Sequence, residues 1–465
     1  MEIIMNIFGT IAAVSTPRGK GGVAVIRISG EGTAEVLARV FRPAGKVSPV
    51  EAPRRAVYGK VVSPEDNSEI DSVLATFFAS PASYTGEDMA EISCHGGVYV
   101  TQAVLSAVLS AGARAAEAGE FTRRAFVSGK LTLTEAEAVG ELLDADTPER
   151  LRLASSALGG KLSDKVHLIG ENLLGAMTAL YAAIDYPEED LAGMSDCEIA
   201  EAISKTLASL RELRATYKRG RAVSEGVKCV ICGRPNAGKS SLYNLMTGEQ
   251  SAIVTDIAGT TRDVLRERVS FGGVTLELCD TAGLRDTDDA VESIGVKRAQ
   301  LEITKAELVI AVFDGSCHLT EDDREMAELY GRENAIAVIN KGDLGYVLDA
   351  HELEFIEKHH GTVVEMCCAA AFGVDTLEAA VGALYDSGAC RLGEDAVIWS
   401  ARQNAALLQA EEDLAAAAEA HGFGEPADAV CTLCESAMGH LMSTDGRGVT
   451  EEIVSGIFSR FCVGK

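Results

Sequence analysis

The sequence contains little positive charge and no long apolar run. Its 42 Lys and Arg residues stand against 70 Asp and Glu residues, which gives a formal net charge of −28. An overall field of this sign does not attract nucleic acid, so any contact with RNA needs a local basic patch or a basic partner. No run reaches the roughly 18 apolar residues of a membrane span. A signal peptide would require basic residues near its start, and no Lys or Arg precedes Arg18. We therefore expect a cytoplasmic protein without a membrane segment.

The cysteines do not predict a metal site. Two of the pairs, Cys229-x-x-Cys232 and Cys431-x-x-Cys434, have the spacing of zinc ligands. The first pair lies on a strand that leads into a phosphate-binding loop, and the second lies in a helical pattern with no matching pair nearby. We interpret both as buried thiols in a reducing compartment.

Four stretches of the chain differ in their patterns. Residues 1–128 mix short strand-like runs with one helix near 98–112, which is typical of an α+β domain. Residues 129–222 are helical, residues 223–384 alternate apolar strands with helices, and residues 385–465 are helical again. Because the helices on both sides of the α/β stretch need a common core, we predict a doubly wound α/β domain inserted into one discontinuous helical domain. Within the first helical stretch, Thr134 and Glu137 have the spacing of a capping box.

A phosphate-binding loop follows the first apolar strand of the α/β stretch. Residues 233–240 fit the pattern G-x-x-x-x-G-K-[ST]. In such loops the backbone N–H groups surround phosphate oxygens, the lysine meets the β- and γ-phosphates, and the hydroxyl ligates Mg²⁺. The predicted nucleotide contacts here are Asn236, Ala237, Gly238, Lys239, Ser240 and Ser241.

Two further motifs each follow an apolar strand, and the second of them favours GTP as the nucleotide. The first comprises Asp280, Thr281, Ala282 and Gly283, where the aspartate would hold the magnesium shell and the Gly283 N–H would contact the γ-phosphate. The second comprises Asn340, Lys341 and Asp343. The Asp343 carboxylate can accept two hydrogens from the guanine edge, which adenine cannot supply in that arrangement. A Ser-Ala turn usually comes next, and Cys367-Cys368 stands there instead.

The hydrolytic machinery differs from that of Ras-type proteins. Leu284 follows Gly283, so no glutamine can orient the attacking water from that position. Glu292 is the candidate for this role, although spacing alone favours an ordinary solvated helix carboxylate at this position. A monovalent cation held by Asn236 and loop carbonyls can supply the missing positive charge. The predicted switch segment comprises Thr255, Asp256, Ile257, Ala258, Gly259, Thr260 and Thr261, with Thr261 completing the magnesium shell.

Several segments together resemble the tRNA-modification GTPase MnmE (TrmE) family. They span both ends and the middle of the chain, namely residues 17–30, 83–88, 95–97, 119–126, 233–241, 255–263 and 461–465. The resemblance implies an N-terminal α+β domain that dimerises and binds a tetrahydrofolate derivative (5-formyl- or 5,10-methylene-tetrahydrofolate). It also implies a discontinuous helical domain and an inserted Ras-like P-loop GTPase domain. Members hydrolyse GTP with K⁺ and Mg²⁺. With the FAD-dependent partner MnmG (GidA) they modify the wobble uridine of certain tRNAs at carbon 5, adding an aminomethyl or carboxymethylaminomethyl group.

The resemblance also assigns roles to individual residues. Asn236, Thr255, Ile257 and Thr260 match the potassium positions, and Ser240 and Thr261 match the magnesium positions. Glu292 matches the acidic residue that orients water. The folate-contacting positions are Arg27, Glu87, Lys130 and Lys465. Cationic side chains suit the carboxylates of a folate, and a carboxylate suits pterin N–H groups. Cys462 matches the family's C-terminal cysteine, as a candidate catalytic thiol or a packed one.

Two other functions are alternatives to this one. A ribosome-associated or regulatory GTPase switch would lack one-carbon chemistry and would need an RNA-binding appendage such as a KH domain, which the sequence does not contain. A folate-dependent enzyme that is merely regulated by GTP overlaps with the leading hypothesis.

Overall fold

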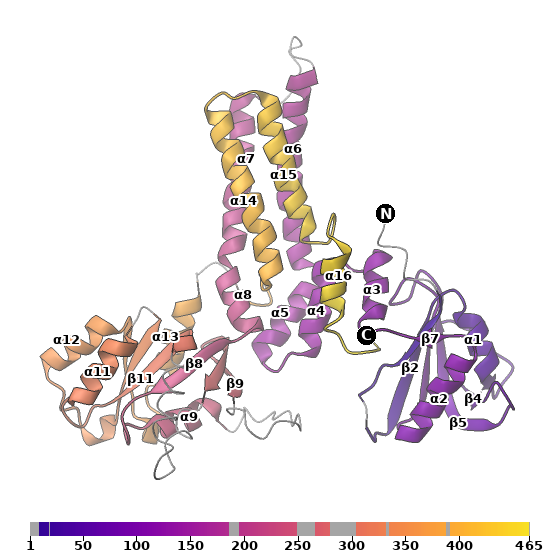
Figure 1. Cartoon of the computed structure of the whole chain (residues 1–465), viewed down its shortest axis with the longest axis horizontal. Coiled ribbons are helices and arrows are strands. Elements are labelled where there is room, and N and C mark those ends of the chain that lie inside the picture. The colour runs from indigo at the N-terminus through magenta and orange to yellow at the C-terminus, as the bar shows by residue number, and fades with distance from the viewer. Residues whose placement is uncertain are drawn as a thin grey trace. The chain divides into compact units, whose positions relative to one another are not determined.

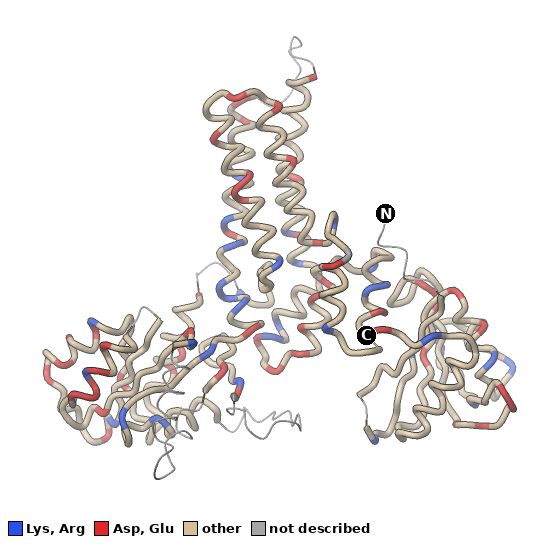
Figure 2. The backbone as a smooth tube through the Cα atoms, in the orientation of Figure 1, with Lys and Arg blue, Asp and Glu red and all other residues tan. Residues whose placement is uncertain are grey.

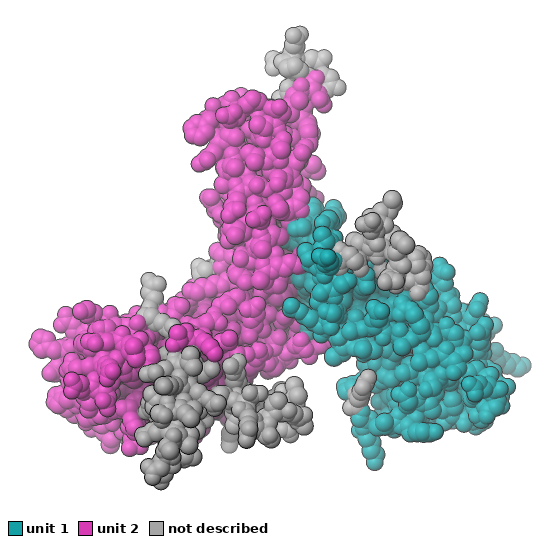
Figure 3. Space-filling view, viewed as in Figure 1, with its two compact units in different colours: residues 1–140, 442–465 teal, residues 141–441 magenta. Residues whose placement is uncertain are grey.

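The computed structural model describes residues 9–17, 19–185, 195–248, 266–279, 304–331, 334–386 and 391–464. The chain divides into two compact units, coloured separately in Figure 3. The first unit comprises residues 1–140 and 442–465, and the second comprises residues 141–441. Both ends of the chain therefore belong to the first unit.

A seven-stranded sheet in the order β3-β4-β5-β6-β2-β1-β7 forms the first unit. Its strands are β1 (Ile11–Val14), β2 (Val23–Ser29), β3 (Phe41–Pro43), β4 (Val57–Val62), β5 (Glu69–Phe78), β6 (Met89–His95) and β7 (Arg114–Ala115). Neighbouring strands are antiparallel except β1 and β7, which are parallel. Helices α1 (Thr33–Val40) and α2 (Val98–Ser110) pack on this sheet (Figure 1). Ile26 and Ile28 of β2 share one core with Leu37 and Val104, as the alternation of apolar residues along β2 requires.

Three further helices of the first unit are α3 (Glu120–Val127), α4 (Leu133–Leu143) and α16 (Glu451–Phe458). Leu133, Val454 and Phe458 form a small core between them. The C-terminal tail packs beside the segment that follows β7, where Val463 forms an isolated antiparallel bridge with Ala118. The tail therefore connects the last residues of the chain with its first strands.

The capping box predicted for α4 is wrong by two residues. The Thr132 N–H donates to the Glu135 carboxylate at 2.7 Å, and the Glu135 N–H donates to the Thr132 hydroxyl at 3.2 Å. Thr134 is fully buried, and its hydroxyl donates to the carbonyl of Thr444 at 3.0 Å. The sequence offers the same Thr-x-x-Glu spacing twice. The fold selects the earlier pair, because Thr134 takes a tertiary contact instead.

The second unit contains a six-stranded sheet in the order β13-β12-β11-β8-β10-β9. Its strands are β8 (Val227–Cys232), β9 (Arg266–Phe271), β10 (Val274–Cys279), β11 (Leu308–Asp314), β12 (Ala335–Asn340) and β13 (Thr362–Glu365). All neighbours are parallel except β9 and β10. Every residue of β12 is buried, as expected for a parallel strand covered on both faces. The helices of this part are α9 (Lys239–Thr247), α11 (Glu321–Tyr330), α12 (Ala350–His359) and α13 (Val374–Tyr385).

Long helices from both sides of the α/β segment pack together in the second unit (Figure 1). They are α5 (Pro148–Leu158), α6 (Lys161–Asp185), α7 (Asp196–Ala215), α8 (Tyr217–Ser224), α14 (Ala401–Gly422) and α15 (Ala427–Ser443). Helix α14 lies along α7, where Leu210 and Leu407 are fully buried and Glu411 accepts bonds from Arg211 and Arg214. The expected multidomain α+β and α/β fold with a helical part is therefore confirmed.

The cysteines of the two pairs with zinc-like spacing are buried, as the sequence predicted. Acidic and basic residues are interspersed along the described trace (Figure 2). Cys229, Cys232, Cys431 and Cys434 are all buried. Among the described residues, no helix is both long enough and apolar enough to cross a bilayer.

Candidate functional site

The phosphate-binding loop connects β8 to α9 through three residues with left-handed backbone. The φ angles are 151° at Gly233, 65° at Asn236 and 105° at Gly238. A Cβ on Gly233 would lie 2.5 Å from the carbonyl oxygen of Val312 on β11. Asparagine is among the few non-glycine residues that accept a left-handed conformation. The pattern of residue types therefore follows from the turn that the loop makes.

The loop ends at the amino terminus of α9, where the free backbone N–H groups of the first turn form the positive end of the helix dipole. Helix α9 begins at Lys239, and no described side chain caps it. Such a helix start binds anions, phosphate above all. Ser240 and Ser241 are exposed in its first turn. The Lys239 ammonium donates to the carbonyl of Arg234 at 2.8 Å, so it lies across the loop.

One buried side chain, Asn340, links the phosphate loop to the loops that follow β12 and β13. Its Nδ2 donates to the carbonyl of Ala237 at 2.9 Å, and its Oδ1 accepts the N–H of Cys368 at 3.0 Å. A Cβ on Gly238 would lie 2.0 Å from the same Nδ2, so only glycine leaves room for the amide. The two predicted motifs are 103 positions apart in sequence, and this side chain joins them in one structural site.

Lys341 and Asp343 follow Asn340 and take different environments. The Lys341 ammonium lies 2.7 Å from Oδ2 of Asp314, at the end of β11. Burial raises the pKa of Asp314, but bonds from Lys341 and Ser316 outweigh it and leave the pKa below its usual value. Asp343 is exposed, and its Oδ1 accepts a bond from the Cys367 thiol at 3.2 Å. The exposed carboxylate can therefore accept N–H groups from a bound base.

Several predicted residues lie outside the described part of the chain. These are the switch residues Thr255 to Thr261, the segment from Asp280 to Gly283, Glu292 and Lys465. Strand β10 ends at Cys279, immediately before that second segment.

The first unit gathers the other predicted folate residues around one face of β2. Two guanidinium nitrogens of Arg27 donate to one oxygen, Oε1, of Glu91 at 2.8 and 3.1 Å. The guanidinium also lies 5.5 Å from the ring centre of Tyr84. Ser29, two residues along the same strand, donates to the Glu87 carboxylate at 2.9 Å. Residues i and i+2 of a strand share a face, so Arg27 and Glu87 lie on the same side of the sheet.

Lys130 completes this group of polar residues. A Cβ on Gly86 would lie 3.2 Å from Cγ of Lys130, so the lysine side chain lies beside the residue that precedes Glu87. The exposed Lys130 ammonium donates to the carbonyl of Pro81 at 3.2 Å. The C-terminal tail arrives at neighbouring β1, where the Ser15 hydroxyl donates to the carbonyl of Gly464 at 2.9 Å. Cys462 of the tail is exposed.

Sequence reasoning missed Arg124, the residue that holds Glu87. Its side chain is 1% exposed, and one guanidinium nitrogen donates to both Glu87 oxygens, at 2.9 and 3.2 Å. The other nitrogen donates to Glu120 at 3.0 Å. Burial raises the pKa of Glu120, but bonds from Arg114, the Glu117 backbone and Arg124 outweigh it and leave the pKa below its usual value. The i,i+4 spacing of Glu120 and Arg124 was the available signal.

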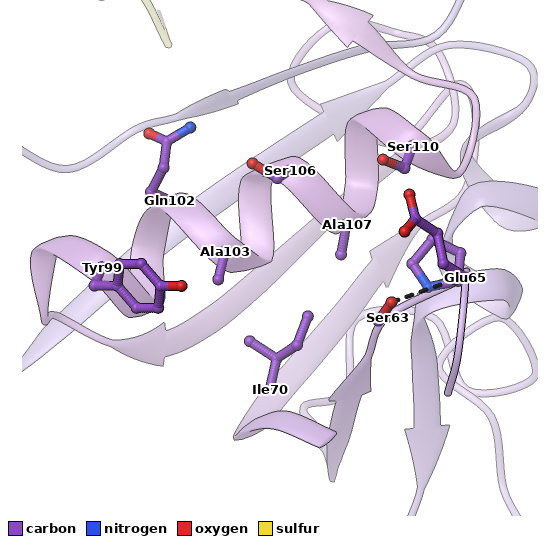
Figure 4. Close-up of a pocket in the computed structure, with 10 residues that line it drawn as sticks. Ser63, Glu65, Ile70, Tyr99, Gln102, Ala103, Ser106, Ala107 and Ser110 are labelled. Carbon is purple, nitrogen blue, oxygen red and sulfur yellow. Dashed lines mark hydrogen bonds between the residues drawn. The ribbon is translucent and has the colours of Figure 1, made fainter. Parts of the chain in front are cut away.

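A separate cavity of about 340 Å³ lies between α2 and the turn that joins β4 to β5 (Figure 4). Tyr99, Gln102 and Ser106 line it from the helix, and Ser63 and Glu65 line it from the turn. None of the predicted site residues lines this cavity.

The glycine-rich loop before α9, tied by Asn340 to a loop that exposes Asp343, defines a P-loop protein of the guanine-nucleotide-binding class. Two family models match the chain: "GTP-binding protein TrmE N-terminus" over residues 10–130 and "MnmE helical domain" over residues 133–462. The chain belongs to the tRNA modification GTPase MnmE family, which confirms the resemblance seen in the sequence.

Relatives match over their full length. The tRNA modification GTPase MnmE of Thermoanaerobacter sp. (strain X514) is 38% identical over 460 residues, which cover 99% of this chain and 100% of the relative. The protein of the same name from Lactiplantibacillus plantarum is 40% identical, covering 98% of this chain and 99% of the relative. Among solved structures, the G domain of the T. maritima FeoB iron transporter is 28% identical and covers 34% of this chain and 98% of its own, with a TM-score of 0.26.

Proposed function

We propose that this protein hydrolyses GTP and acts in the modification of tRNA. Membership of the family over the whole chain supports this function. The single structural observation behind it is the pair of Asn340 bonds, to Ala237 in the phosphate loop and to Cys368 in the loop beside Asp343. One amide thereby holds a phosphate-binding element and a base-binding element at a common site.

The phosphates bind at the start of α9 under this proposal. The backbone N–H groups after Gly238 and the Lys239 ammonium hold the β- and γ-phosphates, and Asp343 accepts the N–H groups of guanine. An ATP molecule cannot supply the same pair of N–H groups, so a carboxylate left unpaired against adenine disfavours it. The predicted contacts of Thr255 to Thr261 and of Asp280 to Gly283 belong to this site.

Two cations fit the residues at the phosphate end. Ser240 is exposed in the first turn of α9 and Asn236 is exposed in the preceding loop, so the side-chain oxygens of both are accessible to cations beside a bound phosphate. Hydroxyl and amide oxygens suit Mg²⁺ and K⁺ as hard cations. We assign Mg²⁺ to Ser240 with Thr261, and K⁺ to Asn236 with Thr255, Ile257 and Thr260. When bound, the cations neutralise charge that develops on the phosphate oxygens. Glu292 orients the attacking water.

The first unit supplies a folate-binding site under this proposal. Arg124 and Ser29 fix the Glu87 carboxylate, which can then accept pterin N–H groups. Lys130 is exposed and can pair with a folate carboxylate, as can Lys465. Arg27 already pairs with Glu91, so a folate carboxylate must share its guanidinium. The bound compound is a 5-formyl- or 5,10-methylene-tetrahydrofolate that donates one carbon to the wobble uridine.

The proposal extends to organisation and partners. We infer an N-terminal domain over 1–128, a helical domain formed by 129–222 with 385–465, and a GTPase domain over 223–384. The protein acts in the cytoplasm as a homodimer, with tRNA and with the FAD-dependent partner MnmG. A regulatory GTPase switch without one-carbon chemistry is the second candidate. This second candidate does not account for the grouping of Arg27, Glu87 and Lys130 in the first unit.

Nucleoside analysis of tRNA from cells lacking this chain tests the function directly. The expected result is loss of the carbon-5 modification of wobble uridine, and unchanged wobble uridines would overturn the assignment.

GTP hydrolysis by the full chain in potassium against sodium chloride tests the cation site. Equal, slow rates in the two salts would refute it. Weaker binding of labelled 5-formyl-tetrahydrofolate to Arg27→Ala, against the unchanged chain, tests the folate site.

A further inference from the structure

The turn after β13 places a thiol against the carboxylate that we assign to guanine. Cys367 stands where a serine is usual in this turn, and its side chain is 4% exposed. Its Sγ lies 3.2 Å from Oδ1 of Asp343. The Cys367 backbone exchanges two hydrogen bonds with Phe372, each of 3.1 Å, so the base of the side chain is held in place.

The neighbouring groups determine which atom carries the proton. The Cys367 thiol is the donor and Oδ1 of Asp343 is the acceptor of this bond. The next thiol, that of Cys368, has its pKa raised to about 11 by burial, so it stays neutral and adds no negative charge beside Asp343 at pH 7. Cys368 itself contributes through its backbone N–H, which donates to Asn340.

We propose that Cys367 is a positioning residue for guanine recognition, holding Asp343 through an S–H donor that is weaker than a serine hydroxyl. This inference rests on the proposed role of Asp343 in binding guanine. The thiol restrains one carboxylate oxygen, and the carboxylate then meets both N–H groups of the base. Because sulfur is a weak donor, a hydroxyl at the same position should hold the carboxylate more firmly.

The base offers a readout that a general loss of folding would not change. Guanine presents its ring N–H and its 2-amino group to a carboxylate, whereas hypoxanthine presents only the ring N–H. When the Asp343 carboxylate loses the restraint from Cys367, the bond that it accepts from the 2-amino group of guanine should weaken first. The ratio of IDP to GDP dissociation constants therefore reports the orientation of Asp343, and a partly unfolded protein lowers both affinities without changing this ratio.

The experiment measures GDP and IDP dissociation constants of the full chain by competition with a fluorescent GDP analogue. For Cys367→Ala we expect GDP affinity to fall three- to tenfold, about 0.6–1.4 kcal/mol, with a smaller loss for IDP and hence a lower ratio. For Cys367→Ser we expect the ratio to return to at least that of the unchanged chain. Cys94→Ala, which removes a buried thiol of β6 in the first unit, is the matched control and should leave both constants unchanged.

The outcomes for two positions distinguish the role of Cys367 from the proposed guanine binding by Asp343. An unchanged ratio in Cys367→Ala, or a ratio in Cys367→Ser as low as in the alanine variant, would overturn the role of Cys367. Asp343→Asn tests the underlying site, since it should weaken GDP and strengthen XDP, whose 2-oxo group pairs with an amide. If Asp343→Asn leaves GDP affinity unchanged, the proposed guanine site is wrong.

Discussion

Asn340 should stabilise the second unit far more than a single polar side chain usually does. It is 3% exposed, and it satisfies the Ala237 carbonyl and the Cys368 N–H at the same time. Asn340→Ala leaves both backbone groups without this partner in a buried site. Each unsatisfied group costs about 1–3 kcal/mol, so the expected loss is about 2–6 kcal/mol. Against the ~5–15 kcal/mol that stabilises a typical domain, this is a large fraction.

Urea unfolding of the full chain, followed by circular dichroism, measures this loss. Asn340→Asp separates the two bonds, because an ionised carboxylate still accepts from Cys368 but cannot donate to Ala237. It should therefore lose stability as well, together with affinity for GDP. Asn404→Ala on α14 is a control in the same unit and should change stability by less than about 0.5 kcal/mol. If Asn340→Ala lies within ~1 kcal/mol of the unchanged chain, the reasoning about the linked loops is refuted.

Three further outcomes concern the first unit. Arg124→Met removes the buried partner of Glu87 and Glu120 and should cost about 3–5 kcal/mol, seen as a lower melting temperature; a melting temperature equal to that of the unchanged chain would contradict this. The folded-state pKa of Glu120 is depressed, so its stabilisation is present above its unfolded pKa and is lost as pH falls through the folded value. Glu120→Gln should therefore flatten the fall of stability in acid, measured by urea unfolding at pH 7 and at steps below pH 5, and an acid profile of unchanged slope would argue against it. Gly464 has a φ of 101°, and a Cβ there would lie 2.3 Å from the Val14 carbonyl oxygen. Gly464→Ala should thus release the tail and speed amide hydrogen exchange over residues 461–464 several-fold, whereas an unchanged rate would show that the tail is not docked through this glycine.

Local patterns predicted the strands and the phosphate loop well, because their causes lie within a few residues. The strand-like run of the sequence at 227–232 has the same bounds as β8, and the runs at 308–313 and 335–339 are each one residue shorter than β11 and β12. A buried parallel strand needs apolar residues throughout, and a left-handed turn needs glycine or asparagine at fixed positions. These requirements can be read without knowing what packs against them.

The tertiary structure alone decided which distant groups meet. Arg124 binds Glu87, 37 residues away, and the Ala237 carbonyl meets an amide 103 residues away. Even a local feature was settled this way, since the cap of α4 begins at Thr132 because Thr134 bonds to residue 444. The sequence by itself determined the chemistry of a guanine-nucleotide site and the strands that carry it. Which carboxylates, thiols and amides restrain one another depended on packing, because those energies arise only where the folded chain removes water and brings the partners together.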